Sequence, residues 1–406
     1  MATDRSSRSG RSGSSRRQFL LGGAVAGLGA AAAVGADFVI TRTGQEPASA
    51  AINGSAVVDF YGAHQAGVEV APQAHSNLIA LDLVEGVDRD ALRRMMRVVT
   101  DDAARMAEGR AALADMEPEL AVVPARLTVT FGFGPGLVAR ARGVAPSWLR
   151  PLPAFAVDRL EDAWTGGDLL VQVSSDDPIT VAHATRMLLK DLRSFARPRW
   201  TQTGFRRAHG SEADGTTMRN LFGQVDGTVN AQSGTDDFDE LVWAREGWIA
   251  GGTSMVVRRI HMDLDRWDRL DRSGREQAVG RTLANGAPLT GVNERDEPDF
   301  AATTPIGFPV IPEFSHLRRA RSDDRTQRIV RRGYNYDEGP TGESVSDAGL
   351  IFISYQADVD RQFVPLQRRL DELDLLNQWI TPIGSAVFAI PPGCQPGGYI
   401  GETLLD

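Results

Sequence analysis

DLLVQVSSDDPITVAHATRMLLKDLRSF, positions 168–195, is the stretch that decides the fold. Its apolar run predicts a strand over Asp168–Ser174, and the helical spacing that follows predicts a helix over Ile179–Phe195. The same pattern returns late in the chain, where the strand LIFISYQADV starts at Leu350 and is followed by a helix predicted over Arg361–Leu373. A strand and helix that recur in this way indicate an internal duplication.

Further segments extend both copies. In the first copy they are a strand over Asn77–Val84, a helix over Arg89–Met106 and a strand over Ala125–Phe133. In the second copy they are a strand over Met255–Leu264, a helix around Arg275–Arg281 and a last strand over Ala386–Ile390. Their order is that of a split βαβ, ferredoxin-like unit. We therefore expect an α+β protein of two ferredoxin-like units side by side, with antiparallel sheets and helices, covering residues 51–222 and 223–406.

The first 50 residues predict an export signal and not a folded part. Ser15–Leu20 (SRRQFL) resembles a twin-arginine motif, and an apolar stretch rich in Ala and Gly follows it to about Val39. Ala48–Ala50 (ASA) supplies a small-residue cleavage pattern, so we expect the mature protein to begin near Ala51. Retention as an N-terminal anchor is the alternative, although the stretch has few bulky side chains. The twin-arginine translocase carries folded proteins, which suits a protein that takes up its cofactor before export to the cell envelope or beyond.

Composition excludes several classes of function. Residues 1–50 carry six arginines and three acidic residues, so the mature chain has 38 basic and 50 acidic residues. This negative balance argues against a nucleic-acid partner. Cys394 is the single cysteine, which excludes an intrachain disulfide and thiolate metal clusters. A homo-oligomer is compatible with the sequence.

Gly223–Thr228 (GQVDGT) places the carboxylate of Asp226 between glycines, which allow backbone to pass close to a flat ligand. The pattern suits proton transfer by Asp226, and it also suits a solvated turn in which Asp226 caps a backbone N–H. Farther on, Thr282–Asp347 predicts a long irregular segment, and loops of that length are usually functional or disordered. We interpret it as a loop that wraps a cofactor.

Only six histidines are present, so a metal or haem ligand can be sought among them. No HExxH, HxH or Cys/His cluster occurs, and a lone histidine ligand points to haem and not to zinc. His316, next to Phe314 and Leu317, is the best candidate; a packed core or loop histidine is the alternative reading. The others lie on a strand (His261), in a helix (His183), in a polar loop (His209) or beside a turn (His64 and His75).

The chain resembles the dye-decolourising peroxidases, which are haem enzymes, over essentially its whole mature length. The resemblance rests on segments in matching order: Tyr61–Gly67, Leu127–Gly136, Asp168–Val173, Gly223–Thr228, Gly286–Thr290, His316, Arg331–Tyr336, Leu350–Ala357 and Pro382–Gly384. One departure is that the Asn-Pro-Arg often found after the axial histidine is missing, since the chain reads Leu317–Arg321 (LRRAR) there.

The resemblance implies one haem b per chain, held in the second half by His316 as the proximal iron ligand. The second ring nitrogen would then donate to a carboxylate, for which Asp374 is our candidate. Gly227, Thr228 and Val229 would pass along the haem edge. On the other side of the haem, Asp226 would move the proton of hydrogen peroxide. Arg331, chosen over Arg332 by its place in the family's R-x-G pattern, would supply a fixed positive charge.

The implied activity is a peroxidase that reduces hydrogen peroxide and oxidises bulky aromatic donors, such as dyes and phenolics, through a high-valent iron-oxo intermediate. Trp267, which we expect at the end of the strand Met255–Leu264 on its polar face, and Tyr336 are candidates for an electron relay to donors too large to reach the haem. Packing residues are the alternative reading. Two other functions remain open at this point. One is an exported protein that releases iron from haem in the manner of a deferrochelatase, and the other is a haem carrier without catalysis.

Overall fold

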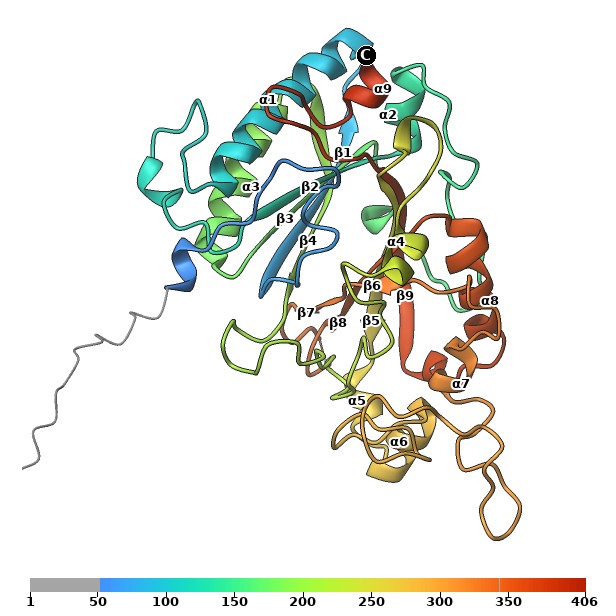
Figure 1. Ribbon diagram of the computed structural model, residues 1–406. Coiled ribbons are helices and arrows are strands. Elements are labelled where there is room, and N and C mark those ends of the chain that lie inside the picture. Colours follow the sequence, from blue (N-terminus) through green and yellow to red (C-terminus); the bar gives the residue numbers. More distant parts are fainter. Residues whose placement is uncertain (1–51, 343) are drawn as a thin grey trace, which may run out of the picture. The chain divides into compact units, whose positions relative to one another are not determined.

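The computed structural model describes residues 52–342 and 344–406 (Figure 1). The predicted signal peptide lies outside these residues. The described part of the chain belongs to one compact unit. None of its helices is both long enough and apolar enough to span a membrane.

The first half has the ferredoxin-like order. Its main elements are β1 (His75–Leu83), α1 (Arg89–Ala107), β2 (Thr128–Phe133), β3 (Leu169–Ser175), α3 (Pro178–Leu192) and β4 (Ala196–Phe205). Short elements complete it: η1 (Asn53–Ser55), η2 (Pro118–Leu120), α2 (Pro135–Arg140) and η3 (Asp162–Trp164). The strands lie in the order β2-β3-β1-β4, and their pairings are antiparallel.

Local chemistry fixes where both long helices of this half begin. Asp88 caps α1 by accepting a hydrogen bond from the Ala91 N–H, and Asp177 caps α3 by accepting from the N–H groups of Ile179 and Thr180. Pro178 stands in the first turn of α3, where a missing N–H costs nothing. The apolar faces of the two helices pack in one core with one face of the first-half strands, which carries Ile79, Phe131 and Val171.

The second half repeats the order. Its main elements are β5 (Thr253–Met262), α6 (Arg272–Val279), β7 (Tyr334–Asp337), β8 (Ala348–Gln356), α8 (Val364–Leu373) and β9 (Ile380–Ile390), with strands in the order β9-β5-β8-β7. The short elements are α4 (Asp236–Val242), η4 (Gly247–Ile249), α5 (Leu264–Trp267), α7 (His316–Ala320), β6 (Val330–Arg331), the π-helical turn η5 (Val359–Phe363), η6 (Leu375–Gln378) and α9 (Glu402–Leu405). The α+β, ferredoxin-like prediction is confirmed.

The two four-stranded sheets join at both edges. Phe133 of β2 pairs with Ala389 of β9, and Phe205 of β4 pairs with Asn335 of β7. Since β5 also pairs with β8, the strands form a closed antiparallel ring. A core of aromatic and aliphatic side chains from both halves fills it, including Leu78, Trp200, Met255, Tyr334 and Phe388. The helices α1 and α3 lie outside the first half, and α8 lies outside the second (Figure 1).

Several predicted elements differ from the structure. The strand predicted over Ala125–Phe133 begins only at Thr128, because Ala125 and Arg126 adopt positive φ angles of 43° and 61°. The strand predicted over Met255–Leu264 ends at Met262, and Leu264 starts α5. The segment Thr282–Asp347, predicted to be irregular, contains α7, β6 and β7.

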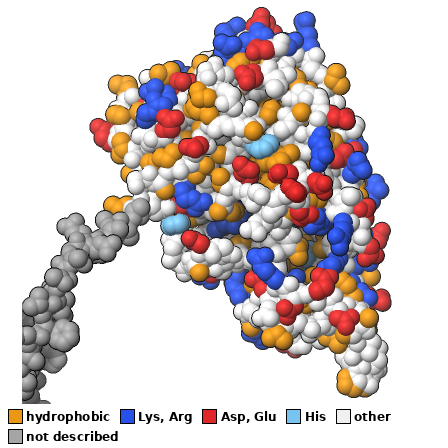
Figure 2. All heavy atoms as spheres, viewed as in Figure 1, with side chains coloured by type: hydrophobic (Ala, Val, Ile, Leu, Met, Phe, Trp, Pro, Cys, Tyr) orange, Lys and Arg blue, Asp and Glu red, His pale blue; other side chains and the backbone are white. Residues whose placement is uncertain are grey.

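On the face shown in Figure 2, acidic and basic side chains are interspersed.

Candidate active site

Asp226 lies in a turn that the sequence builds with glycine and asparagine. Gly223 and Gly227, on either side of it, have φ angles of 79° and 124°, a region that favours glycine. The turn is held by the Asp226 N–H, which donates to the Met218 carbonyl at 2.8 Å. The Asn220 side-chain amide donates to Asp226 Oδ2 at 3.3 Å, and the Asp226 side chain is 16% exposed. Asp226 is therefore a fixed, mostly buried carboxylate and not a solvated turn residue.

Arg331 faces Asp226. Its Nη1 lies 2.7 Å from Asp226 Oδ1, and its side chain is 26% exposed. Asn230 aligns the two segments, because its amide donates to the Arg331 carbonyl at 2.7 Å and its side-chain oxygen accepts from the Arg331 N–H at 2.9 Å. The neighbouring Arg332 is buried and donates to the Val68 and Val70 carbonyls. The structure thus brings Arg331, and not Arg332, to Asp226.

His316 is the first residue of α7, and its ring is oriented by Asp374. The ring Nδ1 lies 2.6 Å from Asp374 Oδ2. The Asp374 side chain is 1% exposed, and its Oδ1 accepts from the Leu376 N–H at 3.0 Å as the cap of η6. This second bond fixes the carboxylate, so Asp374 holds the ring with Nε2 left for another partner.

The pKa of His316 depends on both pairs. Burial alone would lower the pKa of His316, but the charge and hydrogen bond of Asp374 outweigh it and raise the pKa above its ordinary value. The charges of Arg331 and Asp226 also reach the ring, the first lowering and the second raising the pKa of His316. The charges of the acid–arginine pair therefore act on the imidazole ring.

The residues around this site fit a haem. His316 offers Nε2 as an axial ligand, with its tautomer set by the hydrogen bond at Nδ1. Thr228 Oγ1 is buried with no hydrogen-bond partner in the described part of the chain, which suits a contact with a polar group of a cofactor. Gly227 has no side chain to block the approach. Val229 is 65% exposed, so any haem contact it makes is at the outer edge.

Trp267 and Tyr336 lie in the interior. The predicted position of Trp267, at the end of the strand on its polar face, is wrong. Trp267 belongs to α5 and is 1% exposed. Its ring stacks on Phe222 at 4.3 Å between centroids and meets Trp379 edge to face at 5.3 Å. Tyr336, also 1% exposed, packs under the Arg259 guanidinium, 3.8 Å from its ring centroid.

Sequence reasoning did not find Asn220 and Asn230. Both act by hydrogen-bonding across the site: Asn220 holds Asp226, and Asn230 joins the backbone of Arg331, 101 positions away. Their only sequence signal is their closeness to GQVDGT, three residues before it and two after it.

Comparison with known proteins shows the family of this chain. Family models for the N-terminal and C-terminal parts of Dyp-type peroxidases match residues 65–206 and 217–395. The dye-decolorizing peroxidase of Thermobifida fusca is 37% identical over 428 aligned residues, which cover 98% of each chain. The deferrochelatase of Escherichia coli K12 is 33% identical over 370 aligned residues, covering 85% of this chain and 86% of the relative.

Solved structures give the same result. The DyP-type peroxidase of Cellulomonas bogoriensis is 54% identical, with a TM-score of 0.85 over 88% of this chain and 100% of that one. Ferric DtpA of Streptomyces lividans is 40% identical, with a TM-score of 0.83 over 87% and 98% of the two chains. The fold and these comparisons define a haem-iron oxidoreductase. The chain belongs to the Dyp-type peroxidase family, whose members act on peroxide and organic donors.

Proposed function

We propose that the mature chain, from about Ala51, binds one haem b through His316 Nε2 and reduces hydrogen peroxide with Asp226 and Arg331. The observation that carries the proposal is the 2.7 Å ion pair of Asp226 and Arg331, whose charges act on the His316 ring. When bound, the haem supplies the redox chemistry that links peroxide to the organic donor. The protein supplies the axial nitrogen, the proton transfers and the fixed charge.

Asp226 is the group that moves the proton. One oxygen of peroxide must lose a proton and the other must gain one before their bond breaks heterolytically, and a single carboxylate can take the proton and then return it. Asn220 keeps one oxygen of Asp226 in place, while Arg331 holds the other. Arg331 also places a permanent positive charge beside the departing oxygen, where negative charge develops.

Asp374 orients the axial ligand. Its carboxylate accepts the Nδ1 proton, so the lone pair of His316 stays on Nε2, and the hydrogen bond makes that nitrogen a stronger base. Thr228 Oγ1, buried and unpartnered among the described residues, supports our placement of the Gly227–Val229 backbone along the haem edge.

Large aromatic donors require an electron path to the site, and we propose Trp267 as a step in it. Trp267 Nε1 donates to the carbonyl of Phe222 at 3.3 Å, and Phe222 directly precedes the Asp226 turn. Trp379, packed edge to face with Trp267, is half-buried and extends the aromatic path outward. Tyr336 is less suited, because its hydroxyl has no acceptor among the described residues and oxidation of tyrosine releases the phenolic proton.

Export through the twin-arginine translocase to the cell envelope or beyond remains our proposal for localisation, supported by the SRRQFL and ASA segments.

Release of iron from haem is the second candidate function, favoured by the resemblance to the E. coli deferrochelatase. The two functions differ in product. A peroxidase oxidises the donor and keeps its haem, whereas iron release leaves metal-free porphyrin, which fluoresces.

The haem ligand is tested by His316→Ala. We expect a folded protein that no longer retains haem, because the other stabilising contacts of the fold remain while the axial bond is lost. His261→Ala is the matched control, since the His261 side chain is 36% exposed on β5 beside Asp347. The readout is the Soret absorbance per chain after purification. Retention of haem at the wild-type level in His316→Ala would move the axial role to another histidine.

A further inference from the structure

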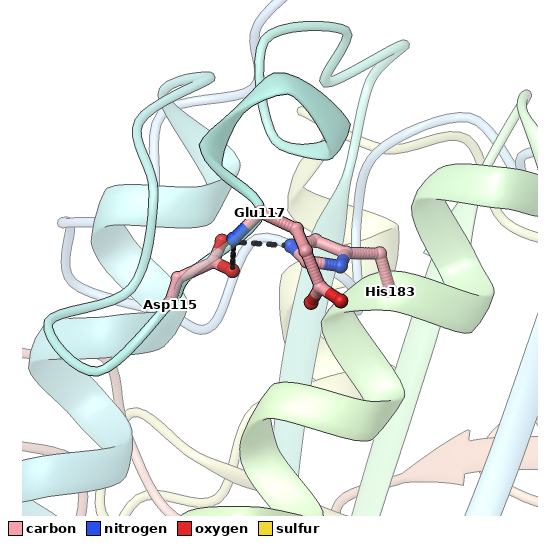
Figure 3. A group of neighbouring side chains, drawn as sticks. All are labelled: Asp115, Glu117 and His183. Carbon is pink, nitrogen blue, oxygen red and sulfur yellow. Dashed lines mark hydrogen bonds and ion pairs between the residues drawn. The ribbon is translucent and has the colours of Figure 1, made fainter.

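A second group of chemically active side chains lies in the first half, on elements that do not build the active site. Asp115 and Glu117 stand in the loop after α1, and His183 stands in α3 (Figure 3). One ligand atom from each of the three lies within 4.8 Å of the others. His183 Nε2 is 2.8 Å from Asp115 Oδ2. An imidazole and two carboxylates at this spacing form a set of donors suited to a divalent cation.

The loop presents its carboxylates to α3 in a fixed way. Asp115 Oδ1 accepts from the Glu117 N–H at 2.9 Å, which leaves Oδ2 to face His183. Figure 3 shows the Asp115 carboxylate pointing across the gap to the His183 ring. The two side chains are 0% and 3% exposed, so they form a preformed, buried pair. Glu117 is 48% exposed and closes the group from the solvent side.

Arg186 brings a positive charge to this group. Its Nη2 meets Glu117 Oε2 and lies 3.4 Å from His183 Nδ1. The Arg186 side chain is 47% exposed, so the guanidinium can turn into solvent at little cost, as expected for an exposed ion pair. The arginine thus places a positive charge beside two of the three donors, Glu117 and His183, and can leave them.

We propose that Asp115, Glu117 and His183 bind a divalent transition cation such as Zn²⁺, with Arg186 as the competing charge. The cation takes Nε2 of His183, one oxygen of Asp115 and the carboxylate of Glu117, and water completes the coordination. The single proton of the neutral ring then resides on Nδ1. Nδ1 faces the Arg186 guanidinium, and two donors cannot share a hydrogen bond, so Arg186 turns outward. The bound ion joins the loop after α1 to α3.

The test is a calorimetric titration of the haem-loaded mature protein with Zn²⁺ after treatment with a chelator. We expect one ion per chain in the wild type and loss of this ion in His183→Gln. Arg186→Gln should bind Zn²⁺ about tenfold more tightly, because a unit charge a few ångströms from the ion is removed from a half-exposed site. His209→Gln is the matched control, as the His209 side chain is 39% exposed beside Asp176, and it should leave binding unchanged.

Two results would overturn the proposal. One is the absence of Zn²⁺ uptake in both the wild type and Arg186→Gln, which would leave the four side chains as an ion-pair network that fastens the loop. The other is uptake that His183→Gln does not weaken, which would place the ion elsewhere. Soret absorbance and far-ultraviolet circular dichroism of each variant verify that the fold and the haem are intact.

Discussion

Asp374→Asn should weaken haem binding through the tautomer of His316. In the wild type the two Asp374 oxygens serve two donors: Oδ2 accepts from His316 Nδ1 at 2.6 Å, and Oδ1 accepts from the Leu376 N–H at 3.0 Å. An asparagine has only one oxygen. If that oxygen keeps the Leu376 cap, the amide NH₂ faces Nδ1, which must then accept, and the ring proton moves to Nε2. A protonated Nε2 has no lone pair for iron.

The size of the effect follows from the role of Asp374. Loss of an outer carboxylate partner lowers metal affinity by about 10-fold to 100-fold, which is about 1.4–2.7 kcal/mol of binding free energy. Burial places the effect at the upper end of this range, since Asp374 is 1% exposed and water cannot replace the lost acceptor. The fold should persist, because Asn keeps the cap of η6.

The assay is titration of the apoprotein with haemin, followed at the Soret band, together with the rate of haem transfer to excess apomyoglobin. Glu372→Gln is the control, since Glu372 lies two residues earlier, is 69% exposed and pairs with Arg319. We expect weaker binding and faster transfer in Asp374→Asn alone. Equal affinity in Asp374→Asn and the wild type would refute the reasoning, because the ring would then not depend on this carboxylate for its orientation.

Two further predictions concern other parts of the chain. Burial, together with the charge and hydrogen bond of Asp102, raises the pKa of Asp191 to about 7, above its unfolded value of 3.8. The folded state therefore keeps a proton that the unfolded state releases, so the stability linked to Asp191 is present at low pH and is lost as pH rises to about 7. Asp191→Asn should raise the melting temperature by about 1–3 °C at pH 8 and leave it unchanged at pH 4, whereas an equal shift at both pH values would exclude this linkage. Trp267→Phe should leave the reaction with peroxide unchanged and slow the oxidation of a large dye more than that of a small phenol, with Tyr336→Phe tested beside it; steady-state rates that fall equally for both donors would make these aromatic residues structural.

The residues with the strongest sequence signals were predicted with their partners. Asp226 stands between glycines whose positive φ angles the turn requires, so a short stretch of sequence is enough to predict the turn. His316 could be chosen among six histidines because the other candidates sat on ordinary elements. The Asp374 pairing has little local sequence signal, since an acid at a helix end usually faces water, and in the structure Asp374 bonds the His316 ring across 58 positions.

Other features depend on tertiary contacts that leave little trace in the sequence. The strands β6 and β7 have two and four residues, too few to show a period of two. They form because β8 offers them a pairing edge. The wrong position predicted for Trp267 has a different, local cause. The strand ends at Met262, and Asp263 then caps α5, which carries Trp267 into the interior.

The most direct test of the account is the rate at which haem-loaded Asp226→Asn reacts with one equivalent of hydrogen peroxide, measured as the change of the Soret band in a stopped-flow experiment. Asp237→Asn is the control, because Asp237 also pairs with an arginine, Arg328, but is 50% exposed. If Asp226 moves the proton, its variant should react about 100-fold or more slowly at unchanged haem content, and Arg331→Leu should be at least as slow. A wild-type rate in Asp226→Asn would contradict the account and leave the step to Arg331 alone.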